Sequence, residues 1–278
     1  MPELPEMQAL SERLAEMLVG QTFASAQPIQ FAGLKTYAPT PESLAGKTIT
    51  DVSRIGKYVV IHFDSDERIL FHLSQAGRLD VETPAKTTRP KQGVVRWKLG
   101  DGTGILIKEF GTERKAGWWV LAPGDDGPLE RLGPEPGTPE FDDLIRTNME
   151  GRRIHTMLRD QKVVSGMGRG YTDDALWKAK LSPYSTFKSL TADDRERLLD
   201  AITFVMDDGL ENERKIESGY PTKKTKHWMV HNKYGQPCPV CETTLERVSY
   251  ASHEVTYCPT CQTGGKVLAD RRTSRFLK

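Results

Sequence analysis

The chain has 278 residues, of which 39 are lysine or arginine and 38 are aspartate or glutamate, for a formal net charge of +1 at pH 7. It lacks an apolar run near the roughly 20 residues that span a bilayer and an N-terminal stretch of the signal-peptide type. We therefore expect a cytoplasmic protein and not a membrane protein. The chain is long enough for one large domain or two ordinary ones.

The N-terminal segment, MPELPE, places Pro2 directly after the initiator methionine. Once that methionine is removed, Pro2 presents a secondary amine, with carboxylates at Glu3 and, one helical turn on, at Glu6. Such an amine titrates near about pH 8, so much of it is neutral at pH 7 and can attack an aldehyde-like carbon. The alternative is that Pro2 and Pro5 only start a helix, because proline is favoured in a first turn.

The first half of the chain reads as a helix followed by strands. Apolar residues at helical spacing predict an amphipathic helix over residues 5–19. Short β-type runs separated by turn-forming residues then predict an antiparallel β-sandwich that carries this helix. The expected strands are 48–52, 58–63, 69–73, 94–99, 104–107 and 118–121. We assign residues 1–121 to this N-terminal domain.

The second half reads as helical. Residues 122–139 contain five prolines and four glycines and are expected to form a linker. Helical spacing then predicts helices over 142–149, 153–158, 173–179 and 192–211, the last with a capping-box start at Thr191 and Asp194. We place a helical domain at residues 140–226 and a final segment at 227–278, which makes an α+β multidomain protein.

The cysteines lie in two pairs, with 16 residues between the pairs. They are Cys238, Cys241, Cys258 and Cys261. This spacing is typical of a four-cysteine zinc ribbon, in which two turns present four thiolates to one tetrahedral ion. Two disulfides are the alternative, but paired C-x2-C turns without a secretion signal favour zinc. All four ligand positions are filled, so the ion is expected to be structural.

Charge is unevenly distributed along the chain. Residues 214–278 carry 12 basic against 5 acidic side chains, a net of +7, which leaves 27 against 33, a net of −6, for residues 1–213. A basic C-terminal part suggests a polyanionic partner for that part of the chain; the alternative is a solvated basic tail without a partner.

Five segments carry one resemblance. They are PELPE at residues 2–6, RIGKY at 54–58, HLSQAGRL at 72–79, the run 160–171 with DAL at 174–176, and YGQPC at 234–238. With the order of the domains, these segments resemble bacterial formamidopyrimidine-DNA glycosylases and endonuclease VIII-like enzymes from end to end. The resemblance implies a catalytic β-sandwich domain with a leading helix, a helix–two-turn–helix domain and a zinc finger.

The resemblance also implies a mechanism, in which a damaged base is flipped out of double-stranded DNA. Pro2 attacks C1′ of the sugar and forms a Schiff base, Glu3 transfers protons as a general acid, and Glu6 holds the amine and Glu3 in place. Lys57 contacts the adjoining phosphate and assists β-elimination. The implied protein is a base excision repair enzyme, a monomer with one zinc ion (Zn2+), working at the nucleoid in the bacterial cytoplasm.

Further residues are implied to face DNA. Gly168 and Tyr171 belong to the helix–two-turn–helix, whose glycines let the backbone approach phosphates at the N-terminus of the following helix. The finger and the tail are expected to place basic side chains on the duplex. The candidates are His227, Lys233, Arg247, Arg271, Arg272 and Arg275.

Five DNA-facing positions differ from the family pattern. With the usual residue in parentheses, they are Gln75 (methionine), Glu109 (arginine), His155 (lysine), Arg169 (asparagine) and His253 (arginine). Lys108 and Phe110 flank Glu109 and are also expected to contact DNA. The Glu109 carboxylate is expected to repel phosphates unless it pairs with Arg114 or Lys115.

The leading hypothesis is a bifunctional DNA glycosylase and abasic-site lyase with altered lesion choice. The alternative is a protein of the same scaffold that binds damaged DNA or abasic sites and has lost or narrowed base excision. A zinc ribbon that serves protein contacts alone would leave Pro2, Glu3 and Lys57 unexplained.

Overall fold

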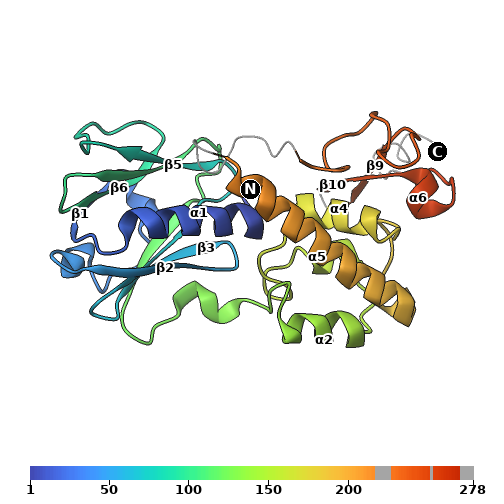
Figure 1. Cartoon of the computed structure of the whole chain (residues 1–278), viewed down its shortest axis with the longest axis horizontal. Helices are drawn as coiled ribbons and strands as arrows, with labels where there is room; N and C mark the ends of the chain where they lie inside the picture. The colour runs from blue at the N-terminus through green and yellow to red at the C-terminus, as the bar shows by residue number, and fades with distance from the viewer. Residues whose placement is uncertain (217–226, 251–252, 270–278) are drawn as a thin grey trace. The chain divides into compact units, whose positions relative to one another are not determined.

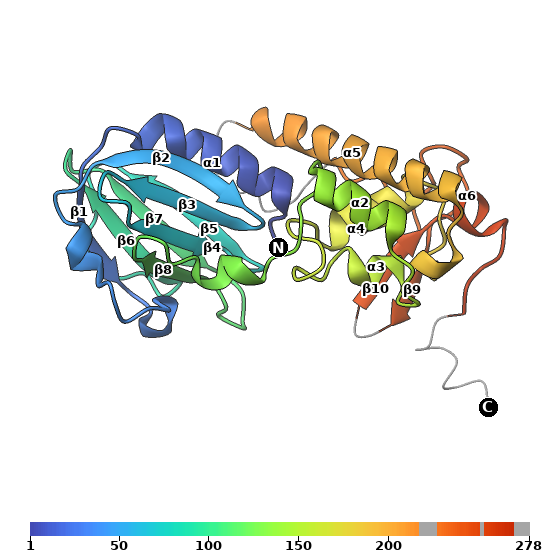
Figure 2. The same ribbon diagram turned by 90° about the horizontal axis from the view of Figure 1, so that it is seen from below.

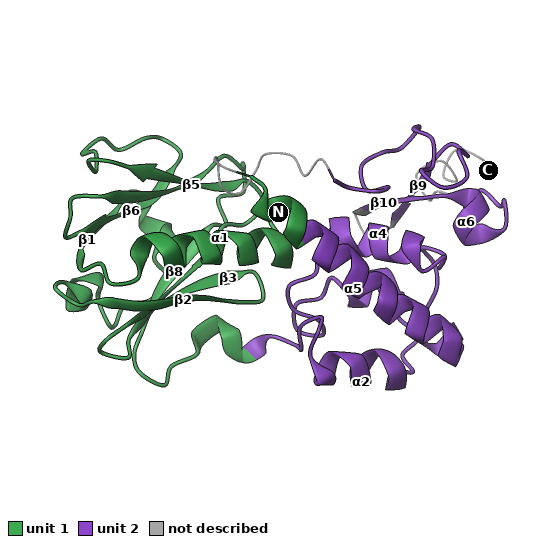
Figure 3. Ribbon diagram, viewed as in Figure 1, with its two compact units in different colours: residues 1–130, 210–224 green, residues 131–209, 225–278 purple. Residues whose placement is uncertain are grey.

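The structure is a computed structural model, which describes residues 1–216, 227–250 and 253–269, without the side chains of residues 250 and 253. It divides into two compact units (Figure 3). Unit 1 comprises Met1–Glu130 and Leu210–Lys224, and unit 2 comprises Arg131–Gly209 and Thr225–Lys278. The finer division predicted from the sequence, with boundaries at residues 121, 139 and 226, remains a prediction.

Two antiparallel sheets form the body of unit 1 (Figure 1). In order across the first sheet, the strands are β1 (Phe23–Pro28), β6 (Gly93–Leu99), β7 (Gly104–Glu109) and β5 (Gly77–Glu82). Across the second they are β2 (Ile49–Ile55), β3 (Tyr58–Phe63), β4 (Arg68–His72) and β8 (Gly117–Leu121). The predicted β-sandwich is confirmed, although β1 and β5 are absent from the predicted strands.

Helix α1 (Leu4–Leu18) leads the sandwich, as predicted. It runs along β2 and contacts β3 as well (Figure 2). A reciprocal capping box fixes its first turn, because the Glu3 side chain accepts from the backbone N–H of Glu6 while Glu6 Oε2 accepts from Glu3 N–H at 2.8 Å. The local sequence therefore sets the direction in which the N-terminus leaves the helix.

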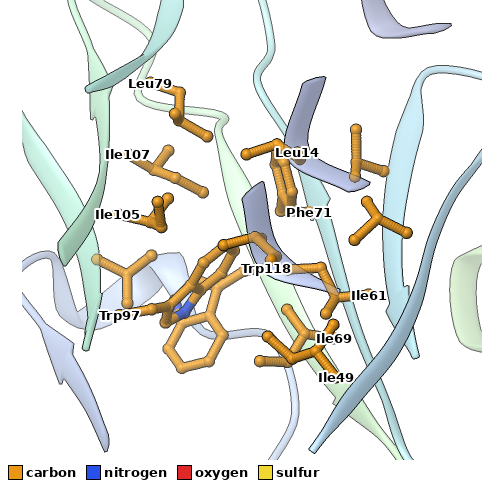
Figure 4. Close-up of a cluster of buried hydrophobic side chains, with 14 of the residues drawn as sticks. Leu14, Ile49, Ile61, Ile69, Phe71, Leu79, Trp97, Ile105, Ile107 and Trp118 are labelled. Atoms are coloured by element: carbon orange, nitrogen blue, oxygen red, sulfur yellow. The ribbon is translucent and has the colours of Figure 1, made fainter. Parts of the chain in front are cut away.

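The core of unit 1 lies between the sheets and under α1 (Figure 4). Trp97 and Trp118, from β6 and β8, are almost fully buried and meet edge to face with ring centroids 6.0 Å apart. Leu14 of α1 belongs to the same cluster, so the helix is anchored through its apolar stripe. Each buried aromatic removes about 150–250 Å² from water, which makes this core a rigid support for the N-terminus.

Unit 2 combines helices with a small hairpin. The elements are α2 (Pro139–Thr147), α3 (Ile154–Met157), α4 (Arg169–Lys178), α5 (Ala192–Arg214), β9 (Glu246–Tyr250), β10 (His253–Tyr257) and α6 (Pro259–Thr263). The end of α5, from residue 210, belongs to unit 1. No helix in the described ranges is both long and apolar enough to cross a membrane.

The predicted capping box of α5 is confirmed. Thr191 Oγ1 accepts from the Asp194 N–H at 3.1 Å, and Asp194 Oδ2 accepts from the Thr191 N–H at 2.9 Å. The buried guanidinium of Arg195 then donates to the carbonyls of Ile145, at the end of α2, and Phe187. This first turn therefore fixes α5 against α2, which lies beside it in Figure 2.

Candidate active site and metal centre

The N-terminus lies in a buried, charged cluster of unit 1. Pro2 is buried, and Glu3 and Glu6 are each 5% exposed. Burial lowers the pKa of the chain's terminal amine, here on Met1; Glu3 and Glu6 raise it, and Lys57 lowers it. The structure thus brings together the predicted Pro2, Glu3, Glu6 and Lys57. Removal of Met1 transfers the terminal amine to Pro2.

The pKa of the Glu6 carboxyl is strongly raised in this cluster. Burial, and then the charge of Glu3, raises the pKa of Glu6 from 4.5 to about 7. Its side chain still accepts the Glu3 N–H, so it fixes the helix start whether or not it is ionised. Glu6 can therefore hold a proton near neutral pH beside the terminal amine.

We expect Glu6→Gln to make the protein more stable at pH 8, by up to about 3 kcal/mol, and to change little at pH 4. The raised pKa of Glu6 means that the folded protein keeps a proton that the unfolded chain loses as pH rises from 4.5 to about 7, so stability falls across this window. Glutamine keeps an oxygen for the Glu3 N–H and does not titrate. Urea unfolding against pH measures the difference.

Glu16→Gln is the matched control, because this substitution removes the same charge from an exposed position of α1. A stability difference between Glu6→Gln and the parent that stays constant from pH 4 to pH 8 would contradict the assignment.

A tight turn carries Lys57 to this cluster. Gly56 and Lys57 join β2 to β3, and Gly56 has φ +59°, the positive value that a type II′ hairpin turn requires at its first central residue. Arg54 donates from Nη1 to the Gly56 carbonyl at 2.9 Å and from Nε to Gln8 Oε1 on α1 at 3.0 Å. Lys57 is 3% exposed, so Arg54 fixes a buried lysine relative to the helix that bears the N-terminus.

His72, at the end of β4, is neutral in this cluster. Burial, then the charges of Lys57 and the terminal amine, lowers its pKa to about 4. Its Nδ1 accepts from the Ser74 N–H at 3.2 Å, and its ring packs on Tyr58 with centroids 5.1 Å apart. His72 therefore adds no third positive charge beside Lys57 and the amine.

The segment predicted to be the void-filling loop forms a sharp turn between β4 and β5. Ser74 has φ +56°, and a Cβ at Gly77 would lie 2.1 Å from the Leu73 carbonyl oxygen, so only glycine fits there. Gln75 is exposed at the tip. The loop therefore presents Gln75 to solvent on a rigid backbone.

Glu109 has a structural role at the end of β7. It is 2% exposed, and its carboxylate accepts the backbone N–H groups of Lys115 at 2.9 Å and Ala116 at 3.0 Å. The expected pairing with the side chain of Arg114 or Lys115 is thus replaced by pairing with backbone. Lys108 forms an ion pair with Asp80 of β5. Phe110 is 51% exposed.

We expect Glu109→Ala to lower the free energy of unfolding by about 2–4 kcal/mol, because two buried N–H groups lose their acceptor. Glu109→Arg, which introduces the usual family residue, is expected to destabilise at least as much. Glu113→Ala in the same loop is the control, since among the described residues Glu113 forms only an exposed ion pair with Lys115, and its loss is expected to cost under about 1 kcal/mol. Urea denaturation of the three variants measures these free energies of unfolding. Equal stability of Glu109→Ala and the control would refute the structural role of Glu109.

The N-terminus of α4 carries two of the predicted DNA-facing residues. Gly168 is the N-cap, and Arg169 donates from Nη2 to the Glu254 carbonyl of β10 at 3.3 Å. Gly170 lies under Trp228, whose ring a Cβ would meet at 2.2 Å, so this glycine permits aromatic packing. Tyr171 is 1% exposed and its hydroxyl lies 3.1 Å from His227 Nε2, which places it inside unit 2.

His155 corrects one of the predictions. Its side chain is fully buried, with Nε2 2.9 Å from Asp173 Oδ1, and the other Asp173 oxygen lies 2.7 Å from His231 Nδ1. Burial raises the pKa of Asp173, but the hydrogen bonds of the two imidazoles outweigh it and hold that pKa below its ordinary value. A lysine here would reach solvent more easily; the histidine instead joins α3, α4 and the finger, a placement that does not fit a contact with DNA.

Several predicted finger residues lie outside the described part. They are the side chain of His253 and the tail residues Arg271, Arg272 and Arg275. Of the others, Arg247 stacks its guanidinium over Tyr234, 4.3 Å from the ring centroid, and pairs with Glu254 at 3.1 Å. Arg247 is therefore a fixed, partly exposed cation on the hairpin.

The predicted metal ligands converge. The sulfur atoms of Cys238, Cys241, Cys258 and Cys261 all lie within 4.8 Å of one another, and three of the pairs are 3.4, 3.5 and 3.9 Å apart. A tetrahedron with Zn–S bonds of about 2.3 Å has edges of about 3.8 Å, so the set fits zinc. These distances also exceed the disulfide bond of about 2.05 Å, and all four thiols are free, which excludes the disulfide alternative here.

The thiol chemistry agrees with a bound cation. Hydrogen bonds with Thr243 lower the pKa of Cys241 to about 6, whereas burial raises the pKa of Cys258 and of Cys261. Four crowded thiols cannot all ionise without a cation, and a zinc ion deprotonates its thiol ligands. The protein therefore has one four-cysteine site for a structural zinc ion.

Arg54, His72 and Asp173 are site residues that the sequence analysis omits. Arg54 and His72 lie within the motifs at residues 54–58 and 72–79, so their places beside Gly56 and Ser74 are a signal in the sequence. Asp173 had no such signal, because its partners lie 18 and 58 residues away.

Known proteins match this chain throughout. Profiles described as the formamidopyrimidine-DNA glycosylase N-terminal domain, the formamidopyrimidine-DNA glycosylase H2TH domain, and a zinc finger found in FPG and IleRS match residues 1–119, 132–219 and 235–264. Formamidopyrimidine-DNA glycosylase of Chloroflexus aurantiacus is 30% identical, over 94% of this chain and 98% of the relative. That of Symbiobacterium thermophilum is 32% identical, over 98% and 93%.

The fold matches as well. A crystal structure of Lactococcus lactis Fpg (MutM) in complex with DNA containing N7-benzyl-Fapy-dG superposes with a TM-score of 0.85, at 24% identity, over 94% of this chain and all of that one. The sequence relatives, at 30% identity or more over nearly the full length, show the family. The chain therefore belongs to the formamidopyrimidine-DNA glycosylase family.

Proposed function

We propose that this protein is a DNA glycosylase and abasic-site lyase that acts through the amine of Pro2 once Met1 is removed. The observation that carries the proposal is the buried N-terminal cluster, in which α1 and the β2–β3 turn gather Glu3, Glu6 and Lys57 around the terminal amine. The names of the relatives give glycosylase activity to those proteins.

The proposed chemistry assigns one step to each side chain. The Pro2 nitrogen bonds to C1′ as the C1′–base bond breaks, and Glu3 delivers a proton to the ring oxygen as the sugar opens to an iminium. Loss of a proton from C2′ then expels the 3′-phosphate, whose charge Lys57 neutralises. Hydrolysis of the imine releases Pro2. Glu6 keeps Glu3 in place through the capping box.

We assign the DNA contacts to residues of each unit. In unit 1, Gln75 and Phe110 are exposed and apt to occupy the space left by a flipped nucleotide, with Lys108 beside Phe110. In unit 2, Gly168 and Arg169 at the N-terminus of α4 are apt to bind a phosphate. The partner is double-stranded DNA with a damaged base or abasic site, bound by a monomer in the cytoplasm.

Borohydride trapping with abasic-site DNA tests the proposal, because it reduces the Schiff base to a stable covalent complex. Base release from a panel of single-lesion duplexes is scored separately from strand cleavage. The second candidate, a damaged-DNA binding protein without excision, is favoured by position 109, where the resemblance implies a DNA-facing arginine and the buried Glu109 supplies no positive charge. Tight binding with neither trapping nor base release would select that candidate.

A further inference from the structure

Trp177, in the last turn of α4, belongs to the core of the zinc finger. It forms one apolar cluster with Val230, Leu245 and the two buried ligands, Cys238 and Cys258. Its own exposure is 7%. A side chain from the helix–two-turn–helix part thus completes a core that the finger sequence supplies only in part.

The indole of Trp177 also makes a polar contact with the metal site. Its Nε1–H donates to Cys238 Sγ, with 3.4 Å between nitrogen and sulfur. An indole can only donate, so the contact suits a sulfur that carries negative charge. Cys238 is 1% exposed, so water cannot reach its thiolate, and a buried charge without a hydrogen bond is costly. Trp177 meets this need.

Two sets of hydrogen bonds hold the finger to the same helix and to Leu181, which lies three residues beyond the end of the helix at Lys178. Asp174 accepts three successive backbone N–H groups, those of Met229, Val230 and His231, at 2.8, 2.9 and 3.0 Å. Gln262 accepts from the Cys258 N–H at 2.8 Å and donates to the Leu181 carbonyl at 2.8 Å. The segment before the first pair of cysteines and the turn of the second pair are therefore both fixed to residues 174–181.

We propose that α4 is a working part of the zinc site, with Trp177 as the residue that positions and stabilises the Cys238 thiolate. Asp174 holds the segment that leads to the first cysteine turn, and Gln262 holds the second cysteine turn, so that both turns can reach one ion. The hydrogen-bond partners of metal ligands commonly change metal retention by about 10–100-fold. Because Arg169 lies at the other end of the same helix, zinc occupancy is coupled to the placement of that residue.

The test is the rate at which zinc passes to a chromogenic chelator. Trp177→Phe removes the N–H and keeps an aromatic ring, and we expect zinc release about 10–100-fold faster than from the parent. Trp228→Phe is the matched control, because Trp228 packs on Tyr171 in the same unit and is expected to release zinc at the parental rate. Equal rates for Trp177→Phe and the parent, or equal acceleration in both variants, would overturn the proposal.

A second measurement uses the unsubstituted protein, so it does not depend on how a variant folds. The chain has five tryptophans. In ¹⁵N-labelled protein, the NMR signals of their indole N–H groups are recorded once with zinc in the site and once with ¹¹³Cd, and the two spectra are compared. We expect one indole signal to shift when cadmium replaces zinc, because its hydrogen bond ends on a ligand sulfur. A spectrum in which no indole signal responds would rule out the contact.

Discussion

A protein that keeps residues ahead of Pro2 is expected to form at least about 10³-fold less borohydride-trapped complex with abasic-site DNA than the processed chain. While Met1 is attached, the Pro2 nitrogen belongs to a tertiary amide and cannot act as a nucleophile. The amine of Met1 is displaced by about one residue, or 3.8 Å, from the position of the Pro2 amine. Such a displacement removes the alignment with Glu3 and Lys57 that the cluster provides.

The matched control is the same fusion protein cleaved so that Pro2 becomes the first residue, which leaves every side chain unchanged. Binding to DNA with a non-reactive abasic-site analogue is measured in parallel and is expected to survive in the extended protein. Pro2→Gly then tests the secondary amine itself and is expected to abolish trapping. If the extended protein traps DNA as fast as the processed one, Pro2 is not the nucleophile.

Loss of one zinc ligand is expected to have the second large effect. Cys258→Ser is expected to lose the ion, lower the melting temperature of the zinc-finger part and weaken DNA binding at least about 100-fold. Structural zinc supplies about 10–16 kcal/mol of folding free energy in zinc-finger peptides. In this chain the finger also packs on α4, so the loss is expected to extend beyond the hairpin. Native mass spectrometry, thermal unfolding and DNA titration measure the three effects.

Thr260→Ala is the control for this variant. Thr260 lies in the same cysteine turn, is exposed, and bonds to the Thr243 hydroxyl at 2.8 Å without ligating the ion. It is expected to keep one zinc per chain and to lose under about 1 kcal/mol. A Cys258→Ser protein with full zinc content and an unchanged melting temperature would contradict a structural role for the site.

Features with a local cause could be predicted from the sequence. Residues a few positions apart determine the helix behind Pro2, the strands with clear alternation and each pair of zinc ligands. β1 escaped prediction because it contains Ala24, Ser25 and Pro28, lies at a sheet edge and is only partly buried. β5 escaped because Gly77 and Leu79 are both part of the loop motif and the start of the strand.

Features that depend on distant partners could not be predicted. His155 is expected at DNA from its place in the motif, yet Asp173 and the finger bury it. The role of Glu109 is hidden for a different reason, because its partners are backbone N–H groups, which every residue type other than proline supplies. The link from Trp177 to Cys238 spans 61 residues and leaves no periodic trace in the sequence.

The inward carboxylate of Glu109 also affects how this protein can change over evolution. The conformation of the segment that includes Lys115 and Ala116 depends on that carboxylate, so position 109 and the loop form one epistatic unit. An arginine at position 109 could not accept the Lys115 and Ala116 N–H groups, which the Glu109 carboxylate accepts in the structure. The segment 108–116 is therefore expected to change between family members as a whole, and not through single substitutions at position 109.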